Sequence, residues 1–522
     1  MLKLGHSRRV WSGRFEHGCR PLGEFARASG AGFGVQSAEM EGSRGGQSSR
    51  DPAAAGSGPR PGGQSRVLET AVLGVGGLGG RVSGGRLDEP VLTDVPTPPV
   101  PGQQHDPIVV ARATRGVIDL WTSLRGTCGW LALTSGVVVG HDTVRHWLLR
   151  LGCHLLRRPV ERRDDWVVIL DHTMQCGTSR CLLVLGMPLR SWQAEGGALC
   201  HRDLHVLMVE VVTSSTGAVV HDQLRRLVAR IGVPAQIVID GGGDLVKGVA
   251  LLREEHPEIV STYDVSHKLA CLLKAELGPD ARWQEYVRLA GPTRASLQQA
   301  RGDVPVPPAL RTKARYQNLE GLVAWGEAIG PLAADAGSVE RLAARRGTTA
   351  EEARRWLAEM VGWVEDYAAD LASWRGLLRI IAATRGQIVA DGLHADSPRD
   401  LERRLHPIDA RGRRLAVAAL AFVRAEASEV PRGWRYVGSS DVIESVFGKY
   451  KGYLERSPRP SLGANVLLFP LFVTRITVKL VREAMTAVKH RTAQLMARER
   501  GGLNPRQRQE EFIPRLQGPN PA

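Results

Sequence analysis

The chain lacks the features that would place it in an oxidising compartment or across a membrane. Its 522 residues include only seven cysteines, an odd and scattered set without a C-x-x-C pair. This pattern argues against a disulfide framework and against a structural zinc site. The longest apolar runs, such as 415–423, reach about half of a membrane span, and the first residues contain no apolar segment of the signal-peptide kind. We therefore expect a protein of a reducing cytosol with no membrane partner.

Acidic residues are also too few to balance the basic ones. The chain carries 69 Lys and Arg against 54 Asp and Glu, a formal net charge of +15. A balance this basic suggests a polyanionic partner without identifying it. From Lys451 onward there are 13 Lys and Arg against 5 Asp and Glu, so the last part of the chain is the most basic. A solvated helix surface is the alternative interpretation of that region.

Residues 1–108 differ in composition from the rest of the chain. They hold 22 of the 59 glycines, with many Ser, Pro and Arg, and show no sustained hydrophobic periodicity. Such a stretch cannot bury enough apolar surface to offset the entropy lost on ordering it. We predict a disordered low-complexity tail; an equally good interpretation is upstream DNA translated from a start site assigned too early. Residues 501–522 are also predicted to be a disordered tail.

A helical domain is predicted over residues 109–160, and it contains a candidate DNA-reading helix. Asp142 and Thr143 are good N-capping residues, and 144–152 is amphipathic. We expect Arg145 and Arg150 on its exposed side. The pattern is that of the second helix of a helix-turn-helix, which enters the major groove. An ordinary helical hairpin packed on the core explains it equally well.

Residues 161–277 are predicted to form the first part of an α/β core. Apolar, β-branched runs predict strands at 166–170, 181–187, 205–212, 235–239 and 261–264, and amphipathic segments predict helices at 216–231, at 244–255 and from 265. Three strands in succession, followed by alternating helices and strands, predict a mixed five-stranded sheet with helices on both faces.

The next segment, 278–433, has long helical periodicity and almost no strand signal, which predicts an all-helical insertion domain. Within it, Arg311, Lys313 and Arg315 alternate beside a tyrosine and are candidates for contacts with backbone phosphates; a solvated charge run is nearly as good an interpretation. The core is predicted to resume over 434–500, with a helix that opens at the capping residues of 438–441.

Three carboxylates stand where a metal-dependent phosphoryl-transfer site would need them. Asp171 and Asp240 each end an apolar strand, and Glu444 lies in the first turns of the later helix, on the same face as Gly448 and Lys451. Carboxylate oxygens are the ligands that Mg²⁺ prefers. Two such ions can activate an attacking oxygen and stabilise a leaving one. The pattern therefore predicts a two-metal site.

Each candidate ligand has a plainer alternative. Asp171 could be a turn residue after a buried strand, and Asp244 could act as ligand in place of Asp240. Asp441 is the main competitor of Glu444, and the step of seven from Glu444 to Lys451 could be a solvated pair. The three glycines after Asp240 would let the backbone approach a bound metal or phosphate closely.

In this order, the motifs resemble those of the DDE transposases, whose catalytic core is RNase H-like. The similar blocks are DHTMQCGT at 171–178, DGGGDLVKG at 240–248, YDVSHKLA at 263–270 and GSSDVIESVFGK at 438–449. They look closest to bacterial insertion-sequence transposases, and the similarity spans about 112–491. The Glu444–Lys451 step matches an E-x6-K signature, but Arg435 and Tyr436 do not match its upstream spacing. Gly241 stands where the family often has histidine.

The resemblance implies both a fold and a chemistry. An RNase H-like core with a helical insertion would hold two Mg²⁺, with Mn²⁺ as a substitute, on Asp171, Asp240 and Glu444. The enzyme would bind double-stranded DNA at the terminal inverted repeats, hydrolyse the phosphodiester at each end and join the 3′ hydroxyl to target DNA. It would act as a homodimer at the nucleoid of the bacterial cytoplasm.

Several basic residues would contact DNA in such an enzyme. His267 and Lys268 follow the fifth strand, and Lys449 and Lys451 lie on the glutamate-bearing helix. A lone histidine such as His267 is more often structural. Two other functions remain possible: a nuclease of the same fold that never joins strands, and an inactive DNA-binding protein derived from a transposase. The complete set of three carboxylates argues against the second.

Overall fold

A five-stranded mixed sheet forms the centre of the core in this computed structural model, which describes residues 100–173, 180–300, 304–309, 319–456 and 462–501. The strand order is β3-β2-β1-β4-β5. The strands are β1 (Trp166–Thr173), β2 (Arg180–Pro188), β3 (His205–Val212), β4 (Gln236–Ile239) and β5 (Val260–Tyr263). β1, β2 and β3 are antiparallel neighbours, whereas β4 runs parallel to β1 and β5 parallel to β4. This is the RNase H-like arrangement, so the predicted fold class is confirmed.

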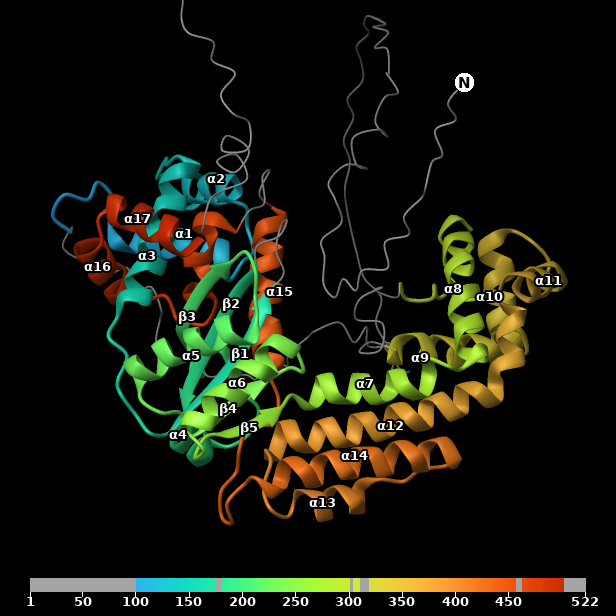
Figure 1. The fold of residues 1–522 in the computed structure, drawn as a ribbon. Coiled ribbons are helices and arrows are strands. Elements are labelled where there is room, and N and C mark those ends of the chain that lie inside the picture. The colour runs from blue at the N-terminus through green and yellow to red at the C-terminus, as the bar shows by residue number, and fades with distance from the viewer. Residues whose placement is uncertain (1–99, 174–179, 301–303, 310–318, 457–461, 502–522) are drawn as a thin grey trace, which may run out of the picture. The chain divides into compact units, whose positions relative to one another are not determined.

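Helices cover both faces of the sheet (Figure 1). Side chains alternate along a strand, so Val168 and Leu170 of β1 pack with α5 (Gly217–Ile231) and α6 (Gly243–Glu255). Val167 and Ile169 point to the opposite face and join the larger apolar core. That face is covered by α15 (Asp441–Glu455), η4 (Gly463–Phe472) and α3 (His141–Arg157). Parallel strands need such crossover helices: α5 lies between β3 and β4, and α6 between β4 and β5.

Among the residues that the structure describes, three helices precede the sheet: α1 (Pro107–Ile118), α2 (Leu124–Ser135) and α3. α3 begins slightly earlier than the capping pattern predicted, with Gly140 as its N-cap and no side-chain cap bond. It packs against η4, α16 (Val478–Ala487) and α17 (His490–Gly501). The candidate DNA-reading helix is therefore enclosed by segments from the far end of the chain.

Arg150 of α3 is buried, so the prediction that it lies on an exposed side is wrong. Its Nε donates to the Val488 carbonyl (2.7 Å) and its Nη2 to the Met485 carbonyl (2.6 Å). Nη1 donates to Gln103 Oε1 (2.8 Å). These carbonyls end α16, where a guanidinium both satisfies unpaired acceptors and complements the helix dipole. The cation is therefore bound by its own protein rather than by DNA.

Between β5 and α15 the described residues are helical apart from turns, loops and one isolated bridge, Leu393 to Tyr436. The elements are α7 (Val265–Leu277), α8 (Ala281–Gln299), α9 (Glu320–Ile329), η2 (Gly330–Ala333), α10 (Ala336–Arg346), α11 (Ala350–Val361), η3 (Gly362–Tyr367), α12 (Ala368–Asp391), α13 (Ser397–Arg404) and α14 (Ala410–Ser428). The remaining short elements are α4 (Leu189–Glu195) and η1 (His201–Asp203). α12 and α14 run along α7, which leads out of the sheet (Figure 1).

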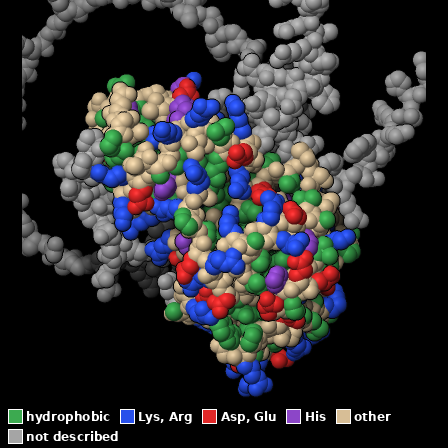
Figure 2. Space-filling view, turned by 60° about the vertical axis from the view of Figure 1, so that its left-hand side comes forward, with side chains coloured by type: hydrophobic (Ala, Val, Ile, Leu, Met, Phe, Trp, Pro, Cys, Tyr) green, Lys and Arg blue, Asp and Glu red, His purple; other side chains and the backbone are tan. Residues whose placement is uncertain are grey.

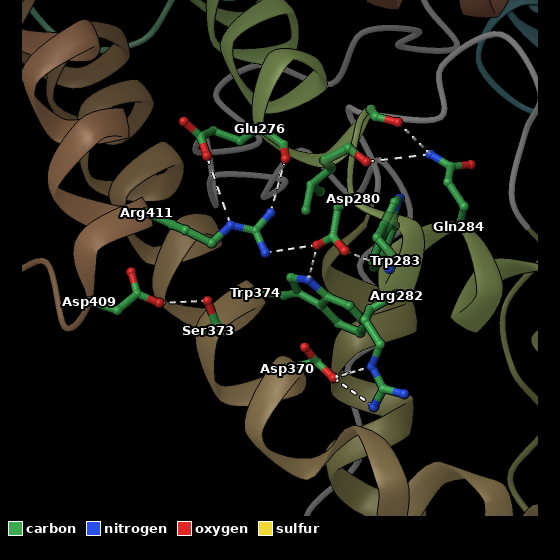
Figure 3. Close-up of polar contacts among 12 residues, drawn as sticks. Glu276, Asp280, Arg282, Trp283, Gln284, Asp370, Ser373, Trp374, Asp409 and Arg411 are labelled. Atoms are coloured by element: carbon green, nitrogen blue, oxygen red, sulfur yellow. Dashed lines mark hydrogen bonds and ion pairs between the residues drawn. The ribbon is translucent and has the colours of Figure 1, made fainter.

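One polar cluster joins four of these helices (Figure 3). Asp280 caps α8 by accepting from the Trp283 backbone N–H (3.1 Å). Its other oxygen accepts from Arg411 Nη1 of α14 (2.7 Å) and from Trp374 Nε1 of α12 (3.2 Å). Arg411 Nη2 also donates to the Glu276 carbonyl at the end of α7 (2.9 Å). A single carboxylate thus links elements more than a hundred residues apart in sequence.

Within the described part of the chain, no helix is both long and apolar enough to cross a membrane.

Candidate active site

Asp171 and Asp240 follow directly after a paired position of two neighbouring strands. In the parallel pairing of β1 with β4, Leu170 is opposite Ile239. The next residue is the aspartate in each case, within β1 for Asp171 and directly after β4 for Asp240. Neighbouring strands are about 4.8 Å apart, and residues opposite one another point to the same face. That face is the one covered by α15. β1 also continues to Thr173, with Asp171 opposite Leu183 of β2, so Asp171 is a strand residue rather than a turn residue.

The electrostatics of Asp171 show that the three predicted carboxylates are close to one another. Burial raises the pKa of Asp171 well above its ordinary value, and the negative charges of Asp240 and Glu444 raise it further. A hydrogen bond from the His172 backbone N–H (2.6 Å) and the positive charge of Lys451 lower the pKa of Asp171, but by less than the other effects raise it. Like charges gathered in one place disfavour ionisation of each member.

Glu444 shows the same effect from the side of α15. Although Glu444 is an exposed residue, the protein around its carboxylate limits hydration. This desolvation, followed by the charges of Asp264 and Asp441, raises the pKa of Glu444 to about 7. Lys451, one helical repeat of seven further on, opposes the shift. Among the described residues, no Lys or Arg forms an ion pair with Asp171, Asp240 or Glu444.

The rival carboxylates differ because each is paired with a cation. Asp244 Oδ2 lies 3.5 Å from Arg180 Nη1 and 3.7 Å from His172 Nδ1. His172 follows Asp171 on β1 and therefore points to the opposite face of the sheet. Asp441 Oδ2 lies 2.6 Å from Arg385 Nη2 of α12. These pairings favour Asp240 over Asp244, and Glu444 over Asp441, as the groups available to a cation.

A fourth aspartate, Asp264, was missed as a site residue. It directly follows β5 and is 1% exposed. Its Oδ2 accepts from the His267 backbone N–H and so caps α7, while its Oδ1 accepts from the Ser440 backbone N–H just before α15; both distances are 2.8 Å. Burial and the charge of Asp441 raise its pKa despite these bonds. The sequence signal was a third aspartate at a strand end, but its partner Ser440 lies 176 residues away.

Replacing Asp264 with Ala is expected to lower the free energy of unfolding by about 1–3 kcal/mol, because two buried N–H groups lose their acceptor. Asp264→Asn, which keeps one acceptor oxygen, should lose less. Denaturant unfolding of both variants measures the effect. If the Ala variant unfolds at the wild-type denaturant concentration, Asp264 does not hold the two helix starts together.

Tyr263 gives a structural reason for glycine after Asp240. Its hydroxyl occupies the position that a Cβ at Gly241 would take. A larger residue there would displace the phenol, so the departure from the family pattern at 241 is tied to Tyr263. Lys268 Nζ lies 5.8 Å from the Tyr263 ring centroid, and the His267 ring lies 5.8 Å from it as well. Both predicted DNA contacts are therefore half-buried around this tyrosine.

The two lysines of α15 that were predicted to contact DNA differ in their surroundings. Lys449 Nζ donates to His201 Nδ1 (2.9 Å), and burial together with this lysine lowers the pKa of His201 to about 4, so the ring is a neutral acceptor. Lys451 is exposed. Between Glu444 and Lys451, a Cβ at Gly448 would meet nothing within 4 Å. The face of α15 that carries Glu444 is therefore open at Gly448.

Of the remaining predicted DNA contacts, Arg145 is half-buried on α3. Arg311, Lys313 and Arg315 lie outside the described residues. Figure 2 shows Lys and Arg side chains spread over one face of the described structure, with Asp and Glu mixed among them mainly in its lower part. On α16, α17 and the residues between them, Lys479, Lys489, Arg491 and Arg498 are exposed.

The carboxylates can also be considered as ligands of a metal ion. Within them, no group of three or more His, Cys, Asp or Glu side chains is arranged to hold a metal ion. The carboxylate oxygens of Asp171, Asp240 and Glu444 are nevertheless hard ligands of the type that Mg²⁺ takes. The repulsion among them, visible in the raised pKa of Asp171, is of the kind that a bound cation relieves.

Comparisons with known proteins gave a structural similarity alone. No protein-family model matches the chain, and no curated protein matches its sequence. Among solved structures, a chain of the Drosophila P element transposase strand transfer complex aligns with a TM-score of 0.33 and 12% sequence identity. The alignment covers 75% of this chain and 94% of the other.

Proposed function

We propose that this chain is a DDE transposase of a bacterial insertion sequence, which cleaves DNA at the terminal inverted repeats and joins the freed 3′ hydroxyl to target DNA. The observation that carries the proposal is the placement of Asp171 and Asp240 next to the paired residues Leu170 and Ile239 of two parallel strands, with Glu444 acting electrostatically on Asp171 from the covering helix. Unpaired, mutually repelling carboxylates at a strand edge are costly for folding and useful for binding cations.

The proposed cofactor is a pair of Mg²⁺ ions, with Mn²⁺ as a substitute, held by Asp171, Asp240 and Glu444. When bound, such ions supply activation of an attacking oxygen and stabilisation of a leaving one. The protein supplies rigid placement: two ligands are fixed by the register of β1 and β4, and the third by a helix whose start is held by Asp264.

Two further features of α15 suit DNA. Gly448 leaves the helix surface open beside Glu444, so a sugar–phosphate backbone can approach. Lys451 is exposed on the same face and can contact a phosphate. The exposed cations Lys479, Lys489, Arg491 and Arg498 are proposed to contact double-stranded DNA elsewhere on the protein. Joining two ends of one element requires a homodimer at least, and we propose that assembly acts at the nucleoid in the cytoplasm.

The test is a reaction of the purified chain with a plasmid that carries the DNA flanking its own gene, with Mg²⁺ or with EDTA. Metal-dependent cuts at the element ends together with joined products are expected. Cuts without joined products would instead support a nuclease of the same fold. End-specific binding without any cut would support an inactive, transposase-derived DNA-binding protein.

A further inference from the structure

Trp121 is held on the surface in a conformation that large residues avoid. Among the described residues it is the sole non-glycine residue with positive φ, at 58°. Its side chain is 45% exposed. A bulky residue in this left-handed region costs about 1–3 kcal/mol and persists where the surroundings impose it. Exposure of a large aromatic ring adds to the cost, so the position calls for a functional explanation.

The loop around Trp121 is rigid. The backbone N–H of Leu120 donates to the Arg115 carbonyl (3.2 Å), and that of Thr122 donates to the Gly116 carbonyl (3.1 Å). The Thr122 hydroxyl donates to the same Gly116 carbonyl (2.8 Å). Both neighbours of Trp121 are therefore tied to the end of α1. The ring is presented in a fixed orientation, which lowers the entropy lost when a ligand binds it.

The ring lies against the helix that carries Glu444. A Cβ at Gly452 would collide with the six-membered ring of Trp121, so the indole edge rests on the bare backbone of α15. The Arg456 guanidinium carbon lies 4.7 Å from the Trp121 ring centroid, a cation–π distance. An aromatic face and a cation are thus combined at the end of α15 that is farther from Glu444.

The distance to Glu444 suits a single DNA strand. Gly452 lies eight residues beyond Glu444, or about 12 Å along the helix axis. Duplex DNA advances 3.4 Å per nucleotide of one strand, and an unpaired strand extends further, so this is at most about three to four nucleotides. Gly448 and the cation of Lys451 are exposed between the two points. A strand whose phosphate is at Glu444 and which follows α15 would reach Trp121 within that number of nucleotides.

We infer that Trp121 is a stacking platform for an unpaired nucleobase of a DNA strand that runs along α15 from the carboxylate site. The base would stack on the ring face that the Arg456 guanidinium does not cover. The inference rests on the proposed function, because it takes the ligand of that site to be DNA. The base must be unpaired and unstacked, since its face has to meet the indole. Stacking on an aromatic side chain contributes about 1–3 kcal/mol per base and tolerates any sequence.

The experiment uses the full chain in EDTA and two fluorescent DNA probes: a short blunt duplex, and the same duplex with a single-stranded tail. Trp121→Asn removes the ring, while asparagine tolerates the left-handed backbone; Trp121→Phe keeps an aromatic face. We expect Trp121→Asn to bind the tailed probe about tenfold more weakly, with blunt-duplex affinity and salt dependence unchanged. Trp121→Phe should stay within about threefold of wild type.

A second readout places 2-aminopurine at each tail position in turn. Quenching confined to one or two positions, and lost in Trp121→Asn, is the expected result. Leu120→Asn is the matched control, because Leu120 is an adjacent apolar side chain that is 61% exposed. An equal loss in this control, an equal loss on both probes, or no loss in Trp121→Asn overturns the inference.

Failure of the inference is distinguishable from failure of the proposed function. If the wild type binds both probes and Trp121 has no influence, the stacking platform alone is refuted. If the wild type binds neither probe, the proposal that the chain acts on DNA fails as well.

Discussion

Replacing Asp171, Asp240 or Glu444 with the matching amide is expected to abolish metal-dependent DNA cleavage, with little change in DNA affinity. The amide keeps the size of the side chain but removes the charge and one acceptor oxygen, which a hard divalent cation requires. Changes to groups that merely support metal ligands already cost about 10–100-fold, so the loss should be larger than that. Gel assays of cleavage and of binding measure the two properties separately.

The substitutions of Asp171 and Glu444 should leave the fold as stable as before, or more stable, at neutral pH. Asp171 and Glu444 have raised pKa values in the folded chain. A raised carboxyl pKa means that ionisation disfavours the folded state above the ordinary pKa, so removal of the charge relieves a cost. Loss of cleavage with an equal or higher melting temperature is the combined signature of a binding site. A variant that melts well below wild type would point to a structural role instead.

Asp244→Asn and Asp441→Asn are the matched controls. Each removes a carboxylate near the site, but one that is already paired, with Arg180 or with Arg385. Cleavage should persist in both. If Asp441→Asn abolished cleavage while Glu444→Gln did not, the assignment of the third ligand on α15 would be wrong.

Replacing Asp280 with Ala is expected to give a large loss of stability, about 2–4 kcal/mol in the free energy of unfolding. The change leaves Arg411 Nη1 and the Trp374 indole N–H without their acceptor and removes the cap of α8. Denaturant or thermal unfolding measures it. Asp370→Ala is the control, because the Arg282–Asp370 pair in Figure 3 is half-exposed and such pairs contribute about 1 kcal/mol or less.

Acid should reduce the difference between wild type and Asp280→Ala. Burial raises the pKa of Asp280, but hydrogen bonds from Arg411, Trp283 and Trp374 outweigh it and lower the pKa below its ordinary value. A lowered carboxyl pKa contributes stability above the unfolded-state value near 4, and the contribution is lost as the pH falls through the folded-state value. A difference that stayed constant into strong acid would contradict the assigned role of the charge.

The parts of the site that depend on local pattern could be predicted from sequence. All five strands occur within three residues of the predicted boundaries, because runs of β-branched residues favour strands without help from distant contacts. That the two apolar runs ending in aspartate lie next to each other, with Leu170 opposite Ile239, is a finding of the structure. Hydrophobic pattern specifies strand register strongly when one or both faces are buried.

The parts of the site that depend on partners far away in sequence could not be predicted. Arg150 reads as a basic residue on an amphipathic helix, and only α16, more than three hundred residues later, shows that it is buried. The sequence shows Asp264 only as a residue at the end of a strand; the structure shows that it accepts a hydrogen bond from Ser440. The sequence shows Gly241 only as a departure from a motif; the structure shows that the Tyr263 hydroxyl leaves no room for a side chain there.

The sequence by itself therefore determined the strands, their order along the chain and the aspartates that follow two of the apolar runs, since these follow from periodicity within short windows. The tertiary structure decided which carboxylates are paired with cations and which are not, through Arg180 for Asp244 and Arg385 for Asp441. It also decided that Trp121 rests on α15. The physical reason is that ion pairing, burial and close packing are properties of neighbours in space, and those neighbours come from elements that no local pattern connects.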